Sequence, residues 1–193
     1  MKNDSLIFRP MARIIRTLGD ELIKDAYAAV IELVKNGYDA DARKVNIEFK
    51  HLYNPDKACI IISDDGHGMD YSTVIDRWMI PGTIDKVKRR ISPQGRVMLG
   101  EKGIGRLAGS KLGKILTLET TDIEGETAII MVDWSVFEKD TFLDKIEFPV
   151  ERKTIAKKHG TELIIENISI EEWDSKSIGI LKKELTQLRD SKN

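Results

Sequence analysis

The amino-acid sequence predicts a two-layer α/β sandwich, with a mixed, largely antiparallel sheet covered by helices on one face. Helical patterns occur near both ends of the chain, over about residues 20–38 and 178–188. Strand patterns fill much of the interval between them. Several of these strands follow one another around short turns, as hairpins do, which argues against regular βαβ winding.

The composition indicates a single folded domain of 193 residues, with 41% hydrophobic and 33% charged residues. This balance excludes a disordered chain. The net charge of −1 gives no global attraction to nucleic acid or to an acidic membrane. The one cysteine, Cys59, excludes a disulfide framework. Apolar runs are far shorter than the roughly 20 residues that span a bilayer. We therefore expect a cytoplasmic protein with no membrane contact.

The first two elements are predicted to be helices. Residues 11–18 fit a short helix, and Gly19 is expected to break it. A longer helix should run from about Asp20 to Tyr38. Its apolar stripe has helical spacing and consists of Ile23, Tyr27, Val30 and Val34.

The middle of the chain is expected to begin with a hairpin. "KVNIEF" (44–49) alternates like a half-buried strand, "NPDK" is a turn, and "KACIIIS" (57–63) reads as a buried strand. A short helix is predicted around residues 71–79, followed by an irregular stretch over 80–103. "GIGRLAGSKLG" (103–113) should be a helix that is entered through glycines.

The last third of the chain is predicted to be mainly strands. The patterns are "KILTLETT" (114–121), "ETAIIMVDW" (126–134), "KIEFPV" (145–150) and "TELIIENI" (161–168). The tail should form an amphipathic helix, because Ile178, Leu181, Leu185 and Leu188 fall on one face.

Three polar residues, Glu32, Asn36 and Asp39, lie on one stripe of the long helix, within about 60° of each other on a helical wheel. The stripe is nearly opposite the apolar one, so taken alone it fits a solvent-facing side. The alternative is the floor of a cleft. There a glutamate could polarise a water molecule as general base, and an amide oxygen one turn away could complete a Mg²⁺ shell.

The segment "DDGHGM" (64–69) follows a buried strand. Gly66 and Gly68 would let the backbone approach a flat ligand. Asp64 at the strand end could accept a hydrogen bond from the exocyclic amine of adenine, whereas the carbonyl of guanine would repel it. A tight Asx turn would explain the same residues equally well.

A second glycine segment, "GEKGIGRLAG" (100–109), precedes a predicted helix. Bare backbone N–H groups at such a place can bind phosphate. Residues 82–106 hold seven basic and two acidic side chains, a local net charge of +5. A basic flap over a triphosphate would look like this, and so would a loop that binds nucleic acid. The pattern G-x-G-x-x-A lacks the full strand that a dinucleotide fold places before it, and a P-loop is absent.

Together, E-x-x-x-N-x-x-D-A (32–40), D-x-G-x-G-M (64–69) and G-x-x-G-x-G (100–105) resemble the boxes of the GHKL ATPase superfamily. "HGTELIIENI" (159–168) looks like the late Gly-Thr strand of that group. Members include type II topoisomerase B subunits, ninety-kilodalton heat-shock chaperones, sensor histidine kinases and MutL. The resemblance covers about residues 20–166 and lies nearer the MutL–MORC–chaperone branch.

The resemblance implies a Bergerat ATP-binding fold and assigns roles to the matching residues. Glu32 would be the base that activates the attacking water, and Asn36 would ligate Mg²⁺. Asp64 would hold the adenine amine, and Thr161 would share a water with it. The other implied contacts are pocket lining by Asp39 and Ala40, an adenine site shaped by Gly66, Gly68 and Met69, a lid over 80–103 with Thr83 and Lys86, and a phosphate cradle of Gly100, Lys102, Gly103, Ile104 and Gly105.

The resemblance also implies partners. Several relatives take a lysine or arginine from a following domain to contact the γ-phosphate, so we expect this chain to be an N-terminal ATPase module that needs a downstream domain or partner. We expect an ATP-dependent homodimer and slow hydrolysis in isolation. Two other functions stay open: a histidine-kinase-type catalytic domain, and an ATP-binding module that contacts DNA.

Overall fold

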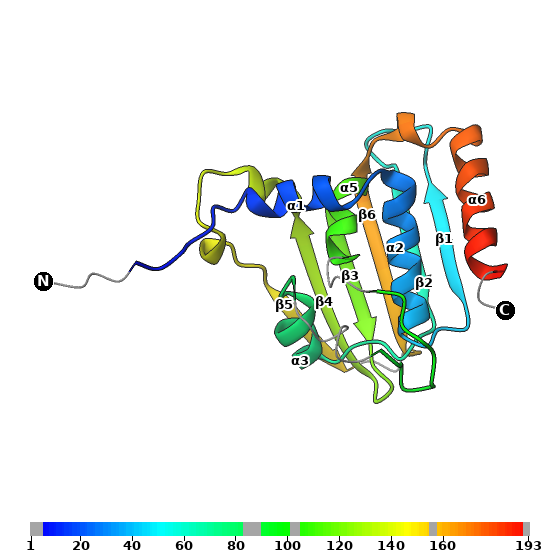
Figure 1. Ribbon diagram of the computed structural model, residues 1–193, viewed down its shortest axis with the longest axis horizontal. Helices are drawn as coiled ribbons and strands as arrows, with labels where there is room; N and C mark the ends of the chain where they lie inside the picture. The colour runs from blue at the N-terminus through cyan, green and yellow to red at the C-terminus, as the bar shows by residue number, and fades with distance from the viewer. Residues whose placement is uncertain (1–5, 83–89, 101–104, 155–157, 191–193) are drawn as a thin grey trace, which may run out of the picture.

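The computed structural model describes residues 6–82, 90–100, 105–154 and 158–190, with the side chains of 189 and 190 left aside. A six-stranded sheet forms one layer, and helices cover one of its faces (Figure 1). The predicted two-layer α/β sandwich is thereby confirmed. No helix among the described residues is both long and apolar enough to cross a membrane.

The strand order in the sheet is β1-β2-β6-β3-β4-β5. The strands are β1 (Val45–Lys50), β2 (Cys59–Asp64), β3 (Gly113–Thr121), β4 (Glu126–Asp133), β5 (Val150–Thr154) and β6 (Gly160–Ile168). Every pairing among these strands is antiparallel, where the sequence predicted a mixed, largely antiparallel sheet. The reason is that β6 inserts between two hairpins and runs opposite to both of its neighbours.

The long helix predicted from Asp20 to Tyr38 is two helices, α1 (Ile14–Leu22) and α2 (Ala26–Asp39). Asp25 separates them: its backbone is extended, and its carboxylate accepts a hydrogen bond from the Ala28 amide at 2.8 Å. It is therefore the N-cap of α2. Gly19 does not break a helix, since it lies inside α1, where an added Cβ would come within 3.0 Å of Ser110 Oγ.

The remaining helices are short except the last. α3 (Tyr71–Thr73) continues into a π-helical turn, η1 (Val74–Trp78), where a helix was predicted. A 3₁₀ turn, η2 (Gly105–Leu107), leads into α5 (Ala108–Leu112). Further 3₁₀ turns are η3 (Trp134–Glu138), η4 (Leu143–Lys145) and η5 (Ile170–Glu172), and α6 (Ser175–Asp190) is the predicted tail helix.

The strand predicted over "KIEFPV" starts later than expected. β5 begins at Val150, and η4 occupies the start of the predicted segment. Pro149 offers no amide hydrogen to a sheet ladder. The backbone before it instead contacts the N-terminal segment, since the Leu143 amide donates to the Pro10 carbonyl at 3.0 Å.

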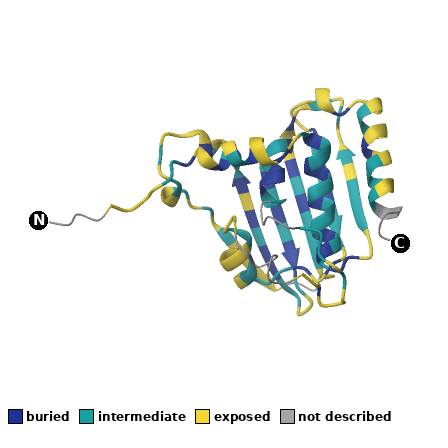
Figure 2. Ribbon diagram, viewed as in Figure 1, coloured by how far each residue is buried: buried dark blue, intermediate teal, exposed yellow. Residues whose placement is uncertain are grey.

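The core lies between the sheet and the helices (Figure 2). Alternate residues of the central strands face it, and cross-strand neighbours such as Ile60 and Ile165 are both 0% exposed. α2 adds Val30 and Leu33 from its apolar side. Because this side of α2 is committed to the sheet, its opposite polar stripe must face outward or into a cavity.

Candidate functional site

A cavity of ≈ 730 Å³ lies over the carboxyl end of β2 and along the polar stripe of α2. That volume suits a small-molecule site. Ten of the residues singled out from the sequence line it: Glu32, Asn36, Asp39, Ala40, Asp64, Gly68, Met69, Gly100, Gly105 and Thr161. Four segments that are distant along the chain thus meet around one space.

One described residue of the predicted site, Gly66, does not line this cavity. Gly66 is buried behind Asp64 and supports it from the backbone. The other five predicted site residues, Thr83, Lys86, Lys102, Gly103 and Ile104, lie outside the described residues.

One end of the cavity is built on the sheet. Asp64 is the last residue of β2, and its cross-strand partner in β6 is Thr161. The Gly66 amide donates to Asp64 Oδ1 at 2.9 Å. Burial raises the pKa of the Asp64 carboxyl, against hydrogen bonds from the Gly66 and Thr161 backbones that lower it. The result is an acceptor held at a fixed place in a partly desolvated pocket.

Thr120 belongs to this end, although the sequence analysis did not select it. Its hydroxyl oxygen accepts from the Met69 amide at 2.9 Å and lies 3.1 Å from Thr161 Oγ1. Its side chain is 0% exposed. Thr120 therefore links the first glycine segment (64–69), the glycine loop, to β6. The signal was present: alternation along β3 places this polar residue on the same face as Leu116 and Leu118.

The glycine loop is pressed against the end of β3. Gly68 has a φ of +65°, and an added Cβ would lie 1.8 Å from the Thr121 carbonyl oxygen. The His67 amide donates to the Ala40 carbonyl at 2.9 Å, which joins the loop to the end of α2. Only glycine fits at position 68, so the loop leaves its backbone open toward the cavity.

The other end of the cavity is built on α2. Glu32 and Asn36 lie one helical turn apart and both line the space. Gly105 sits directly against Asn36, since an added Cβ would be 3.1 Å from Asn36 Nδ2. The end of the second glycine segment thus packs against the side-chain amide of Asn36. Lys35 lines the same end, and its Nζ lies 2.7 Å from Glu32 Oε1.

Asp39 joins α2 to the segment that leads into the second glycine box. Its carboxylate accepts from the Leu99 amide at 2.7 Å and from the Gly100 amide at 3.0 Å. The side chain is only 4% exposed. Sequence spacing showed that Asp39 shares the stripe of Glu32, but it could not show these two amides, which lie 60 and 61 residues away.

A small hairpin over residues 90–98 forms part of the wall. It closes through a bridge between Ile91 and Val97. Asp41 anchors it, accepting from Ser92 Oγ at 2.5 Å and from the Gln94 amide at 3.0 Å. Asp41 is 5% exposed and has a φ of +62°. The return half of the predicted 80–103 lid is therefore attached to the end of α2.

Arg106 fastens the opposite wall. Its Nη1 donates to the carbonyl oxygens of Arg77, Trp78 and Ile80, the last at 2.8 Å. Burial lowers the pKa of the guanidinium to about 10, so it stays charged at neutral pH. The side chain thereby links the end of the η1 turn to the start of η2.

The donor set suits a magnesium ion that is shared with phosphate. No group of three or more His, Cys, Asp or Glu side chains suited to a metal occurs among the described residues. Mg²⁺ commonly takes one or two protein oxygens and fills its shell with phosphate oxygens and water. Asn36, with an amide oxygen, fits that pattern beside Glu32.

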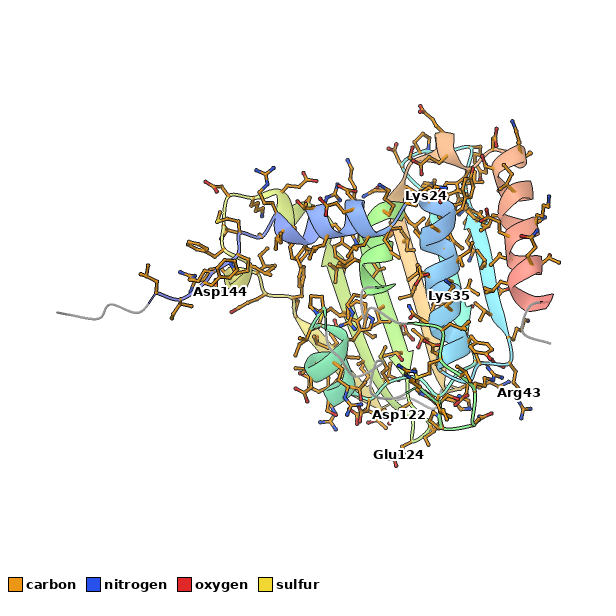
Figure 3. All side chains as sticks on the ribbon, viewed as in Figure 1. Lys24, Lys35, Arg43, Asp122, Glu124 and Asp144 are labelled. Carbon is orange, nitrogen blue, oxygen red and sulfur yellow. The ribbon has the colours of Figure 1, made fainter. Side chains whose placement is uncertain are left out.

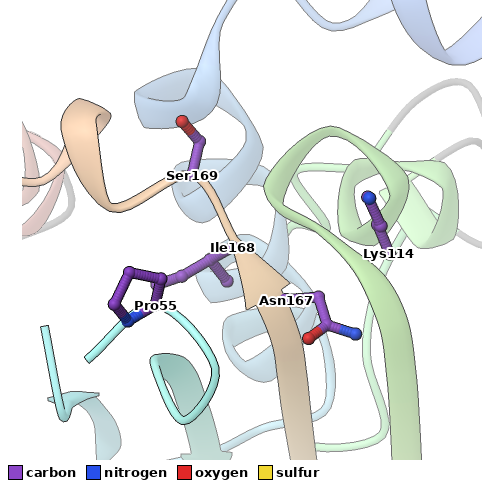
Figure 4. Close-up of a pocket in the computed structure, with 5 residues that line it drawn as sticks. All are labelled: Pro55, Lys114, Asn167, Ile168 and Ser169. Carbon is purple, nitrogen blue, oxygen red and sulfur yellow. The ribbon is translucent and has the colours of Figure 1, made fainter.

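Another depression lies at the far end of the sheet, near the end of β6 and the start of β3 (Figure 4). Its lining residues are Pro55, Lys114, Asn167, Ile168 and Ser169. None of the motif residues lines it. The described motif residues therefore lie around the cavity at the Asp64 end of the sheet and not around this depression.

Comparison with known proteins identifies a related family. A family model described as "Histidine kinase-, DNA gyrase B-, and HSP90-like ATPase" matches residues 25–161. The matched region begins at the N-cap of α2 and ends at Thr161, so it contains every described residue that was predicted for the site. No curated protein matches the chain.

Proposed function

The chain belongs to the family of histidine kinase-, DNA gyrase B- and HSP90-like ATPases, which are ATP-binding domains of GHKL type, and we propose that it binds MgATP in the α2 cavity and hydrolyses it slowly as a conformational switch. The supporting observation is that carboxylates stand at both ends of one cavity, Asp64 at the sheet end and Glu32 at the helix end.

The adenine is proposed to lie at the sheet end. Asp64 accepts a hydrogen bond from the exocyclic amine, and Thr161 shares a water with Asp64. Gly68 and Met69 leave the backbone close to the flat base. Guanine has a carbonyl where adenine has its amine, so it would leave the Asp64 carboxylate unpaired.

The phosphates are proposed to lie toward α2. Asn36 and the phosphate oxygens would hold Mg²⁺, which when bound neutralises part of the triphosphate charge. Gly100 and Gly105 border this end of the cavity, and Glu32 accepts a proton from the attacking water. Thr83, Lys86, Lys102, Gly103 and Ile104 are proposed to complete the lid and the phosphate cradle.

The switch is proposed to act through the walls of the cavity. Asp39 and Asp41 hold the return limb of the lid, and Arg106 holds the segment that leads into it. MgATP bound between these attachments would favour association of two copies. We propose that the domain spans residues 1–193, acts in the cytoplasm and lies nearer the MutL–MORC–chaperone branch.

The test is calorimetric binding of MgATP to the wild-type chain and to Asp64→Asn. We expect the wild type to bind and the variant to lose about 100-fold or more in affinity, because a buried donor-acceptor match is broken. Asp56→Asn, in the exposed turn before β2, is the matched control and should bind like the wild type. Equal affinity in Asp64→Asn would refute the site.

A further inference from the structure

A lysine lies beside the proposed base. Lys35 Nζ is 2.7 Å from Glu32 Oε1, and both side chains line the cavity while remaining partly shielded, at 26% and 33% exposed. Figure 3 labels Lys35 on α2, between the two ends of the helix. Lys35 occupies an unspecified position of the E-x-x-x-N pattern, so the motif gives it no role.

The helix geometry places Lys35 and Asn36 on opposite sides of Glu32. At about 100° per residue, Lys35 lies about 60° to one side of Glu32, and Asn36 lies about 40° to the other. Gly105 packs against Asn36, so the second glycine segment ends at this same place on the helix. The proposed general base, Glu32, is thus flanked by a candidate metal ligand, Asn36, and by a cation, Lys35.

An ordinary helix-surface ion pair would explain the contact alone, since glutamate and lysine three residues apart attract each other on any exposed helix. For comparison, Lys153 and Glu151 on the edge strand β5 form an exposed ion pair at the same 2.7 Å, with side chains 50% and 62% exposed. The pair on α2 differs because it is more shielded and lines the cavity. A cation there acts in a medium that screens its charge less.

We propose that Lys35 is a catalytic residue that contacts an oxygen of the terminal phosphate when MgATP is bound. This proposal rests on the function proposed above. Before binding, the ammonium offsets the Glu32 carboxylate, which would otherwise repel the triphosphate. During hydrolysis it stabilises the negative charge that spreads over the transferring phosphoryl group.

The proposed step is the attack of water on the terminal phosphate. The oxygen of a water molecule bonds to the γ-phosphorus, and the bond from that phosphorus to the β,γ-bridging oxygen breaks. Glu32 takes one proton from the water, and the electron pair of the broken bond stays on ADP. Lys35 keeps its protons throughout and acts only by charge and hydrogen bonding.

The experiment compares Lys35→Ala, Lys35→Arg and the control Lys153→Ala. Binding of MgADP and of the magnesium complex of the β,γ-imido analogue of ATP is measured by calorimetry, and kcat and KM are measured with MgATP. We expect Lys35→Ala to bind the analogue about tenfold more weakly, to keep its MgADP affinity, and to lose roughly 10–100-fold in kcat. Lys35→Arg should retain most of each property because it keeps the charge.

Lys35→Ala is also made in a Glu32→Gln background. This variant tests whether Lys35 contacts the phosphate directly or acts only through Glu32. Analogue affinity should still fall there, because the lost contact is to phosphate. An unchanged affinity in that background, or an unchanged or raised kcat in Lys35→Ala alone, would overturn the proposal. A wild-type chain that binds neither nucleotide would refute the proposed function itself, whereas normal wild-type binding with a silent Lys35→Ala would refute only the role of Lys35.

Discussion

The two ends of the cavity are built in different ways. At the sheet end, Asp64, Thr161 and Thr120 lie on adjacent strands, and their positions follow from the register of the sheet. At the helix end, contacts join segments that do not share a sheet, such as the Asp39 carboxylate with the Leu99 and Gly100 amides.

This difference fits the separate tasks that we propose for the two ends. Strand-end residues within a six-stranded sheet move only if the ladder opens, so the proposed adenine site is already formed before any ligand binds. Side-chain contacts between loops and helix ends can form and break more easily, and this suits groups that must respond to the terminal phosphate. Substitutions at the sheet end should therefore affect the interactions with ATP and with ADP equally. Substitutions at the helix end should affect the two nucleotides differently.

The largest expected effect is at the helix end. Glu32→Ala should retain MgATP affinity and lose about 10²–10⁴-fold in kcat, the usual contribution of a positioned general base. Steady-state phosphate release and calorimetry on the same preparation measure both quantities.

Asn36→Ala supplies the contrasting variant. It should lose affinity that depends on Mg²⁺, so chelation of the metal should weaken ATP binding in the wild type and have little further effect in the variant. Normal hydrolysis by Glu32→Ala would show that another group is the base.

A smaller effect is expected at the sheet end from Thr120→Val. The Met69 amide would lose its acceptor in a fully buried place, which should cost about 1–3 kcal/mol in the free energy of unfolding. Affinities for MgATP and MgADP should fall by the same factor. Urea denaturation and calorimetry check this, with Thr117→Val on the opposite face of β3 as control. A loss confined to MgATP would remove the distinction between the two ends.

The smallest effect concerns pH. Because burial raises the pKa of Asp64 in the folded chain, the folded state holds a proton that the unfolded state has released at pH values just above 3.8. Stability should therefore fall as pH rises from 3.8 through the raised native pKa. Asp64→Asn lacks this titration, so its stability relative to wild type should increase over the same window.

Urea denaturation of both proteins across a pH series measures the difference. A difference that stays constant with pH would mean that the Asp64 carboxyl does not titrate with a raised pKa. A confirmed trend would mean that the ionised Asp64 carboxylate destabilises the fold.

Much of the fold followed from local patterns. The hairpin of β1 and β2, the strands β3, β4 and β6, and the tail helix are where hydrophobic periodicity placed them. The errors arose where a tertiary contact overrode a local preference. Gly19 lies inside α1, where an added Cβ would come within 3.0 Å of Ser110 Oγ. β5 starts late because Pro149 has no amide hydrogen for the ladder and η4, whose Leu143 amide donates to the Pro10 carbonyl, occupies the start of the predicted segment.

The candidate site followed from motif spacing only in part. Ten of the eleven described residues that were predicted for the site line one cavity, and the eleventh, Gly66, supports Asp64 from the backbone. Thr120 and Lys35 were missed because Thr120 lies outside the motifs and Lys35 occupies an unspecified motif position. Thr120 is a buried hydrogen-bond partner across strands, and Lys35 stands out only through its contact with Glu32. Pairings of this kind depend on which faces meet, and a motif does not record that.

The sequence by itself determined the periodicities, the strand ends at which carboxylates and glycines stand, and the order of the four motif segments. Helical periodicity left open whether the Glu32–Asn36–Asp39 stripe faces a cavity or bulk solvent; the motif resemblance implied a pocket, and the tertiary structure shows it. The physical reason is that periodicity fixes which side of a helix is polar, whereas what covers that side comes from segments tens of residues away. Asp39 shows this directly, since the amides that hold it come from Leu99 and Gly100.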